Sequence, residues 1–173
     1  MYRYAISSPI GNFWVDYTEP VFQSDLIRAD GIVVLNHGHE ERTSKDLFTE
    51  YPTNQYSMDL QPIASQVRTI GVAQQLIQGE ETEIATVNIL RMTGQQKIGW
   101  HVFRSMIALE FAEQKFGVNG IGSVGHSMGG MATALHAFIE PKLRVAYFDA
   151  AVSDLAKTGP GALDQIDTYY SSG

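Results

Sequence analysis

The sequence contains no cysteine among its 173 residues. This absence excludes disulfide frameworks, thiolate metal sites and cysteine nucleophiles, and it leaves the compartment undetermined. The sequence also lacks any apolar run approaching the roughly 18 residues that a membrane span needs. Its first residues do not show the charged-then-apolar order of a signal peptide, which for a native N-terminus indicates the cytoplasm.

Basic residues are scarce: 12 lysines and arginines stand against 19 acidic residues, giving a net charge of −7. A surface this acidic, without a Lys/Arg cluster, argues against nucleic acid or an anionic membrane as the main partner. Hydrophobic residues make up 44% and charged residues 18%, a balance typical of one globular domain with a sizeable core. The sequence predicts no cofactor. It also lacks the helix-spaced pair of histidines that is typical of zinc hydrolases. The oligomeric state cannot be predicted from it.

Apolar periodicity predicts alternating elements from Gly31 onward. Strands are expected within residues 31–38, which end in turn residues, and at 72–77, 121–124 and 143–152. Helices are expected at 60–70, 98–116 and 128–139. Residues 2–6, 12–17 and 25–29 are interpreted as strands at an antiparallel sheet edge. The alternation predicts an α/β fold, with a mostly parallel sheet covered by helices on both faces.

Aromatic and aliphatic residues mark one face of the longest expected helix. Trp100, Phe103, Ile107 and Phe111 are spaced three, four and four residues apart. Trp100 and Phe103 could line an acyl pocket, but this helical spacing favours a place in the core.

Two glycine motifs overlap in "NGIGSVGHSMGG" at residues 119–130. From Gly120 the segment fits the G-x-G-x-x-G of a dinucleotide-binding loop, and from Gly125 it fits the G-x-S-x-G of a serine hydrolase. The dinucleotide loop needs a strand before Gly120, where the pattern is helical. The hydrolase motif needs a strand, a turn at Ser127 and a helix from Met128, which the pattern supplies. The remaining alternative is a small-residue packing turn with an incidental serine.

Small residues surround Ser127 as a nucleophile elbow requires, because strand and helix approach closely there; these are Gly125, Gly129 and Gly130. Ser127 is therefore the predicted nucleophile. An oxyanion needs backbone donors, of which one is the N–H of Met128 and the other comes from the loop after residue 36. In that loop Gly38 allows a sharp turn, and the N–H of His39 is the expected second donor. The alternative is a plain strand-ending turn.

Taken together, "NHGHEE" at 36–41, "GW" at 99–100, "NGIGSVGHSMGG" and "LRVAYFDAAV" at 143–152 resemble the α/β-hydrolase superfamily. The chain is most similar to the branch of dienelactone hydrolases, acetyl xylan esterases and polyester-degrading hydrolases. The resemblance covers roughly residues 31–152. It implies Ser127 as nucleophile, with Met128 and His39 as oxyanion donors. The chain departs from many members at His101, where they carry an aspartate.

The triad of this fold follows the order serine, acid, histidine. The sole histidine after Ser127 is His136, about 13 Å along the same helix at about 1.5 Å per residue, so it cannot serve as the base. Asp149, at the end of the last expected strand, is the candidate acid, with Asp154 second. The alternative for Asp149 is a solvated strand-end carboxylate or a helix cap.

These observations predict that residues 1–173 form a single partial α/β-hydrolase domain. Its core spans 31–152, and residues 153–173 are a loop or the start of an incomplete segment. The final strands and the catalytic histidine are expected to be missing. The predicted function is a serine carboxylic-ester hydrolase that acts on small-molecule esters through an acyl-enzyme. The alternatives are an acyltransferase on the same fold and a catalytically inactive binding domain.

Overall fold

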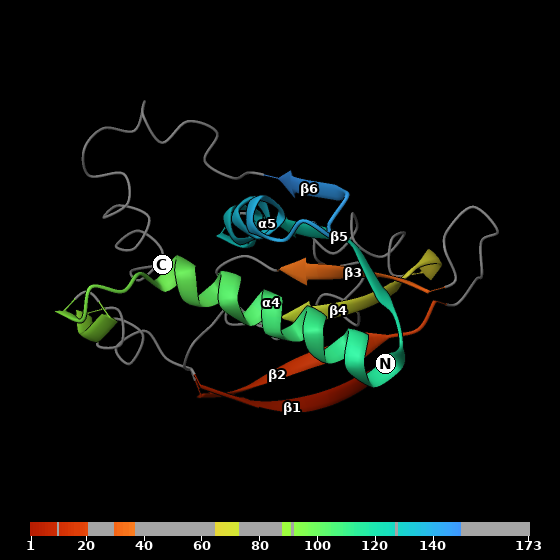
Figure 1. Cartoon of the computed structure of the whole chain (residues 1–173), viewed down its shortest axis with the longest axis horizontal. Helices are drawn as coiled ribbons and strands as arrows, with labels where there is room; N and C mark the ends of the chain where they lie inside the picture. Colours follow the sequence, from red (N-terminus) through yellow and green to blue (C-terminus); the bar gives the residue numbers. More distant parts are fainter. Residues whose placement is uncertain are drawn as a thin grey trace, which may run out of the picture.

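The computed structural model describes residues 1–9, 11–20, 30–36, 65–72, 88–90, 92–126 and 128–149. They form a mixed six-stranded sheet with two long helices (Figure 1). The strands are β1 (Tyr2–Ser8), β2 (Gly11–Thr18), β3 (Gly31–Asn36), β4 (Arg68–Val72), β5 (Asn119–His126) and β6 (Val145–Asp149). The helices are α4 (Lys97–Phe116) and α5 (Met128–Ile139).

The strand order is β1-β2-β4-β3-β5-β6. Strands β4, β3, β5 and β6 pair in parallel, whereas β2 runs antiparallel to both of its neighbours. In Figure 1 the β1–β2 pair forms one margin of the sheet and β6 the other. The mostly parallel sheet with an antiparallel margin, as predicted from the sequence, is thereby confirmed.

Both faces of the central strand β3 are buried. Ile32 and Val34 pack into the cluster that contains the inner residues of α4, while Val33 and Leu35 pack with Val67 in a second cluster. Because successive side chains of a strand point to opposite faces, the two clusters lie on opposite sides of the sheet. Helices α4 and α5 lie on the same side, since they also pack against each other.

Helix α4 ends at a glycine in a left-handed conformation. Gly117 has a φ of 64°, and its N–H donates to the carbonyl of Glu113 at 3.1 Å. Glycine adopts this conformation without the steric penalty that a Cβ brings, so it terminates the helix at the expected place.

The buried face of α4 matches the predicted one only in part, since Ile107 and Phe111 pack against the core. Phe103 is 40% exposed, and Trp100 is half-buried with its indole N–H donating to Gln95. Phe111 meets Tyr4 of β1 at a ring-centroid distance of 5.4 Å. Many buried positions of α4 lie outside the predicted face, and they include the polar His101 and Ser105 as well as Val102, Ala108, Leu109 and Ala112.

The element boundary near residue 70 was also predicted incorrectly. The helix expected to continue to residue 70 has ended by then, and Arg68–Val72 form β4. Ile70 and Val72 alternate toward the α4 side, and β4 is hydrogen-bonded between β2 and β3. Pairing on both sides therefore decides the conformation against the local spacing. The strand expected at 25–29 and most of that expected at 72–77 lie outside the described residues.

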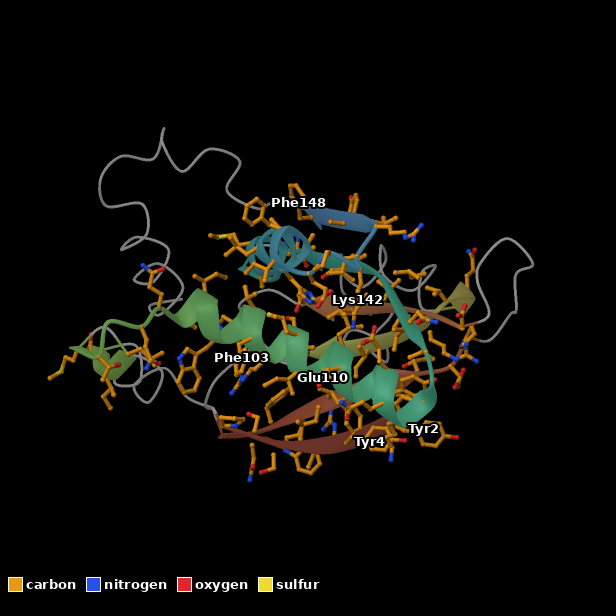
Figure 2. The ribbon with its side chains drawn as sticks, viewed as in Figure 1. Tyr2, Tyr4, Phe103, Glu110, Lys142 and Phe148 are labelled. Carbon is orange, nitrogen blue, oxygen red and sulfur yellow. The ribbon has the colours of Figure 1, made fainter. Side chains whose placement is uncertain are left out.

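Large apolar side chains are exposed at the β6 margin. Val145 of β6 is 64% exposed and Phe138 of α5 is 89% exposed, and Figure 2 shows Phe148 at the same margin. Among the described strands, β6 has a neighbour on one side only. Apolar strand edges of this kind favour association with other chains.

We expect Phe138→Lys and Val145→Lys each to reduce self-association of the chain, measured by sedimentation velocity. Thermal stability should stay close to that of the parent, because both side chains lie in solvent. Gln114→Lys, which adds the same charge to an exposed position of α4, is the control. Equal effects from all three lysines would show that net charge, and not the apolar margin, controls association.

Candidate active site

The turn between β5 and α5 is tightly packed. Strand β5 ends at His126 and α5 begins at Met128, so Ser127 alone separates them; Ser127 itself lies outside the described residues. A Cβ on Gly125 would lie 2.2 Å from the carbonyl oxygen of Gly129 and 2.5 Å from the hydroxyl of Thr133. Strand and helix therefore approach so closely that position 125 has no room for a side chain.

The alternative dinucleotide motif does not form a loop. Gly120, which would open such a loop, is the second residue of β5, and residues 119–126 are all strand. A phosphate-binding loop needs its glycines in a turn between strand and helix. The rejection of the dinucleotide interpretation is thus confirmed.

The loop predicted to supply the second oxyanion donor begins beside this turn. Asn36, the last residue of β3, is in register with Gly125 of the parallel strand β5. β3 therefore ends at the same edge of the sheet as β5, the strand that precedes Ser127 in the chain. Gly38 and His39 lie outside the described residues, so their assignment stays a prediction.

Two further predicted residues lie at the same edge. Met128 is the first residue of α5, where backbone N–H groups have no partner within the helix. Asp149 is the last residue of β6 and is in register with His126. The side chains of both lie outside the described residues, as does all of Asp154.

Four fully buried polar side chains form a network below the turn: Asn36, Ser105, Ser123 and Thr133. The Asn36 amide nitrogen donates to the Ser123 hydroxyl at 3.1 Å and to the Thr133 hydroxyl at 3.0 Å. The Ser105 hydroxyl donates to the Asn36 amide oxygen at 2.6 Å. Local sequence patterns do not predict this network. Its only sequence signal is a polar residue inside each of two apolar strands.

His136 does not reach the site as a base. It is fully buried in α5, and its ring nitrogens have no hydrogen-bond partner among the described residues. Burial lowers the pKa of His136 to about 4, although the nearby Glu140 carboxylate acts in the opposite direction. The ring is therefore neutral near pH 7 and enclosed. His101, where the sequence departs from its resemblance, is also buried, and its carbonyl accepts a hydrogen bond from Ser105.

A cavity of about 320 Å³ lies at the other end of the sheet, between α4 and the turn after α5. Its lining includes Glu110, Glu113, Glu140 and Lys142, and Figure 2 labels Glu110 and Lys142. Glu113 also accepts a hydrogen bond from the N–H of Gly120, near the start of β5. The cavity is thus remote from Ser127, which follows the end of β5. No three His, Asp or Glu side chains among the described residues form a group that could hold a metal ion.

Comparison with known proteins identifies the fold. No protein-family model matches the sequence, and no curated protein matches it either. A cold-adapted esterase from an Arctic intertidal metagenomic library is 14% identical, with a TM-score of 0.52 over 84% of this chain. A lipase/esterase from Lactobacillus plantarum is 16% identical, with a TM-score of 0.53 over 96% of this chain. The chain has the α/β-hydrolase fold.

These two solved structures are longer than this chain. The chain spans 58% of the length of the cold-adapted esterase and 67% of that of the lipase/esterase. At these identities the likeness establishes the α/β-hydrolase fold and not the chemistry. Within the described part of the chain, no helix is both long and apolar enough to cross a membrane.

Gly125→Ala tests the packing of the strand-to-helix turn in this α/β-hydrolase fold. Its methyl group would meet backbone atoms of Gly129, so we expect the free energy of unfolding to fall by about 1–3 kcal/mol. Gly99→Ala is the matched control, because its Cβ would meet nothing within 4 Å and alanine gains up to about 1 kcal/mol in a helix. Urea denaturation measures both variants. A Gly125→Ala protein as stable as the parent would contradict the close contact.

His136 should make the stability of the fold dependent on pH. The folded ring titrates near 4 and the unfolded ring near 6.5, so the unfolded chain binds more protons between these values. Stability is therefore retained above pH 6.5 and falls as the pH drops toward 4, by about 3 kcal/mol in total. His136→Leu should lack this component, measured by urea denaturation of both proteins across the window. Parallel pH profiles would contradict the assignment.

Proposed function

We propose that the chain belongs to a serine hydrolase that cleaves carboxylic esters of small molecules through an acyl-enzyme on Ser127. The observation that carries this proposal is the contact between Gly125 and Gly129, with one residue between strand and helix. A nucleophile elbow requires this close approach, since the serine stands on a sharp turn above the sheet. The α/β-hydrolase fold adds support, because the turn follows β5 at the carboxyl edge of the parallel strands.

In the proposed reaction, the Ser127 hydroxyl attacks the ester carbonyl while a base takes its proton. The N–H groups of Met128 and His39 hold the oxyanion of the tetrahedral intermediate. The base then returns the proton to the departing alcohol, which leaves the acyl group on Ser127. Water, activated by the same base, releases the acid and restores the serine.

Asp149 is the proposed acid of the triad. Support comes from its place at the end of β6, beside His126 and so next to the chain position of Ser127. A carboxylate at this edge could orient a histidine that faces the serine.

The proposed base lies beyond the 173 residues. His136 is enclosed in α5, and the chain spans only 58% of the length of the matched cold-adapted esterase. A serine without its base keeps a high pKa and is a weak nucleophile. We therefore propose that residues 1–173 alone hydrolyse esters poorly, while the chain extended by its native downstream sequence is active.

The test compares residues 1–173 with the extended chain on p-nitrophenyl acetate. We expect robust turnover only from the extended chain, and loss of roughly 10⁴-fold or more of it in Ser127→Ala. Ser7→Ala, an exposed serine of β1, is the control and should keep parent activity. A fluorophosphonate probe should label the extended chain at Ser127 and leave its Ser127→Ala variant unlabelled.

The outcomes separate the parts of this proposal. Unchanged turnover in Ser127→Ala of the extended chain would remove Ser127 as nucleophile. Robust, Ser127-dependent turnover by residues 1–173 would mean that the base comes from within this chain, with His39 the first candidate. Faster product formation with transfer to an added alcohol would indicate an acyltransferase.

A further inference from the structure

The buried network of Asn36, Ser105, Ser123 and Thr133 connects four elements through one amide. Asn36 ends β3, Ser123 lies in β5, Thr133 in α5 and Ser105 in α4. The amide nitrogen bonds the hydroxyls of β5 and α5, and the amide oxygen accepts from α4. The Ser123 and Thr133 hydroxyls also lie 3.3 Å apart. Removing the Asn36 amide would therefore release these side-chain hydrogen bonds to β5, α5 and α4, while the backbone pairing of β3 with β5 remains.

The position of Asn36 in the chain links this network to the proposed oxyanion site. His39, the proposed second donor, follows Asn36 by three residues in the chain. Ser123 and Thr133 lie on the strand and the helix that flank Ser127. One side chain thus joins the end of β3, which precedes the proposed donor in the chain, to the strand and the helix on either side of Ser127.

We propose that Asn36 is a positioning residue, which fixes the loop carrying the His39 N–H relative to the turn carrying Ser127 and Met128. The inference rests on the proposed function. An oxyanion is stabilised only by donors already placed about 3 Å from where its charge develops. A shift of about 1 Å in such a site can reduce the rate by about a hundredfold.

Shape and hydrogen bonding at Asn36 can be separated by substitution. Asn36→Leu keeps a similar volume and removes every bond of the amide. Thr133→Val keeps the shape of Thr133 and removes its hydroxyl, while Thr133→Ser keeps the hydroxyl and is the conservative variant. If Asn36→Leu does not fold, Thr133→Val provides the test, because this variant keeps Asn36 and removes one of its hydrogen-bond partners.

A positioning role predicts a particular kinetic signature in the intact protein. Asn36→Leu should lower kcat by about tenfold to a hundredfold, while KM changes less than about threefold, because the loss falls on the transition state. Affinity for a boronic acid, which forms a tetrahedral adduct on serine, should fall in parallel with kcat. Thr133→Val should lower kcat and boronic-acid affinity in the same way but to a smaller extent. Thr133→Ser, which keeps the hydroxyl, should keep both near the values of the unsubstituted protein.

Val15→Ala controls for stability alone, because Val15 is a fully buried residue of β2 and lies outside the network. All rates are measured well below the unfolding midpoint of each variant. If Asn36→Leu and Val15→Ala both keep kcat and boronic-acid affinity within twofold, the network is only structural and the proposal is overturned. Ser127→Ala distinguishes this result from failure of the proposed function. If Ser127→Ala leaves turnover intact, both the proposed function and the role of Asn36 are overturned. If Ser127→Ala abolishes turnover, only the proposed role of Asn36 is overturned.

Discussion

The close approach of β5 and α5 at Gly125 is the constraint on which the rest of the site depends. Because position 125 has no Cβ, the carbonyl of Gly129 and the hydroxyl of Thr133 can lie close to the backbone of β5. Thr133 can then reach the amide of Asn36 on β3. A Cβ at position 125 would meet these atoms of α5, the helix that also packs against α4. One glycine therefore sets the distance between the helix layer and the sheet.

Burying four polar side chains below this turn is unfavourable unless they satisfy one another. An unpaired buried amide or hydroxyl loses its bonds to water and gains nothing in return. Here Asn36 bonds on both sides of its amide, and Ser105, Ser123 and Thr133 each bond to it. Apolar contacts would hold the same elements together with less directional preference, whereas this network accepts one arrangement of β3, β5, α4 and α5.

Local pattern was sufficient for some elements and insufficient for others. Helix α5 was predicted with the observed bounds, because its small residues begin directly after Ser127 and Pro141 follows its end. Val67 and Ile70 misled the prediction, since a spacing of three fits a helix face while pairing with β2 and β3 makes residues 68–72 a strand. The bonds of Asn36 join residues 69 to 97 positions apart, and no local signal reports partners at that distance.

The two ends of the sheet differ because the parallel strands all run in one direction. Side chains of α4 and the turn after α5 cover one end, and the loops that follow the strands leave from the other. At the amino end of β5, Glu113 accepts from the Gly120 N–H and pairs with Lys142 at 2.8 Å, so α4 and the turn after α5 close that end. At the carboxyl end, β3 and β5 finish side by side and β6 finishes beside β5. Parallel strands bring their following loops to a single edge, which concentrates groups from distant parts of the sequence there. Asn36, His126 and Asp149 thus come together through topology at the end of β5 that precedes Ser127 in the chain.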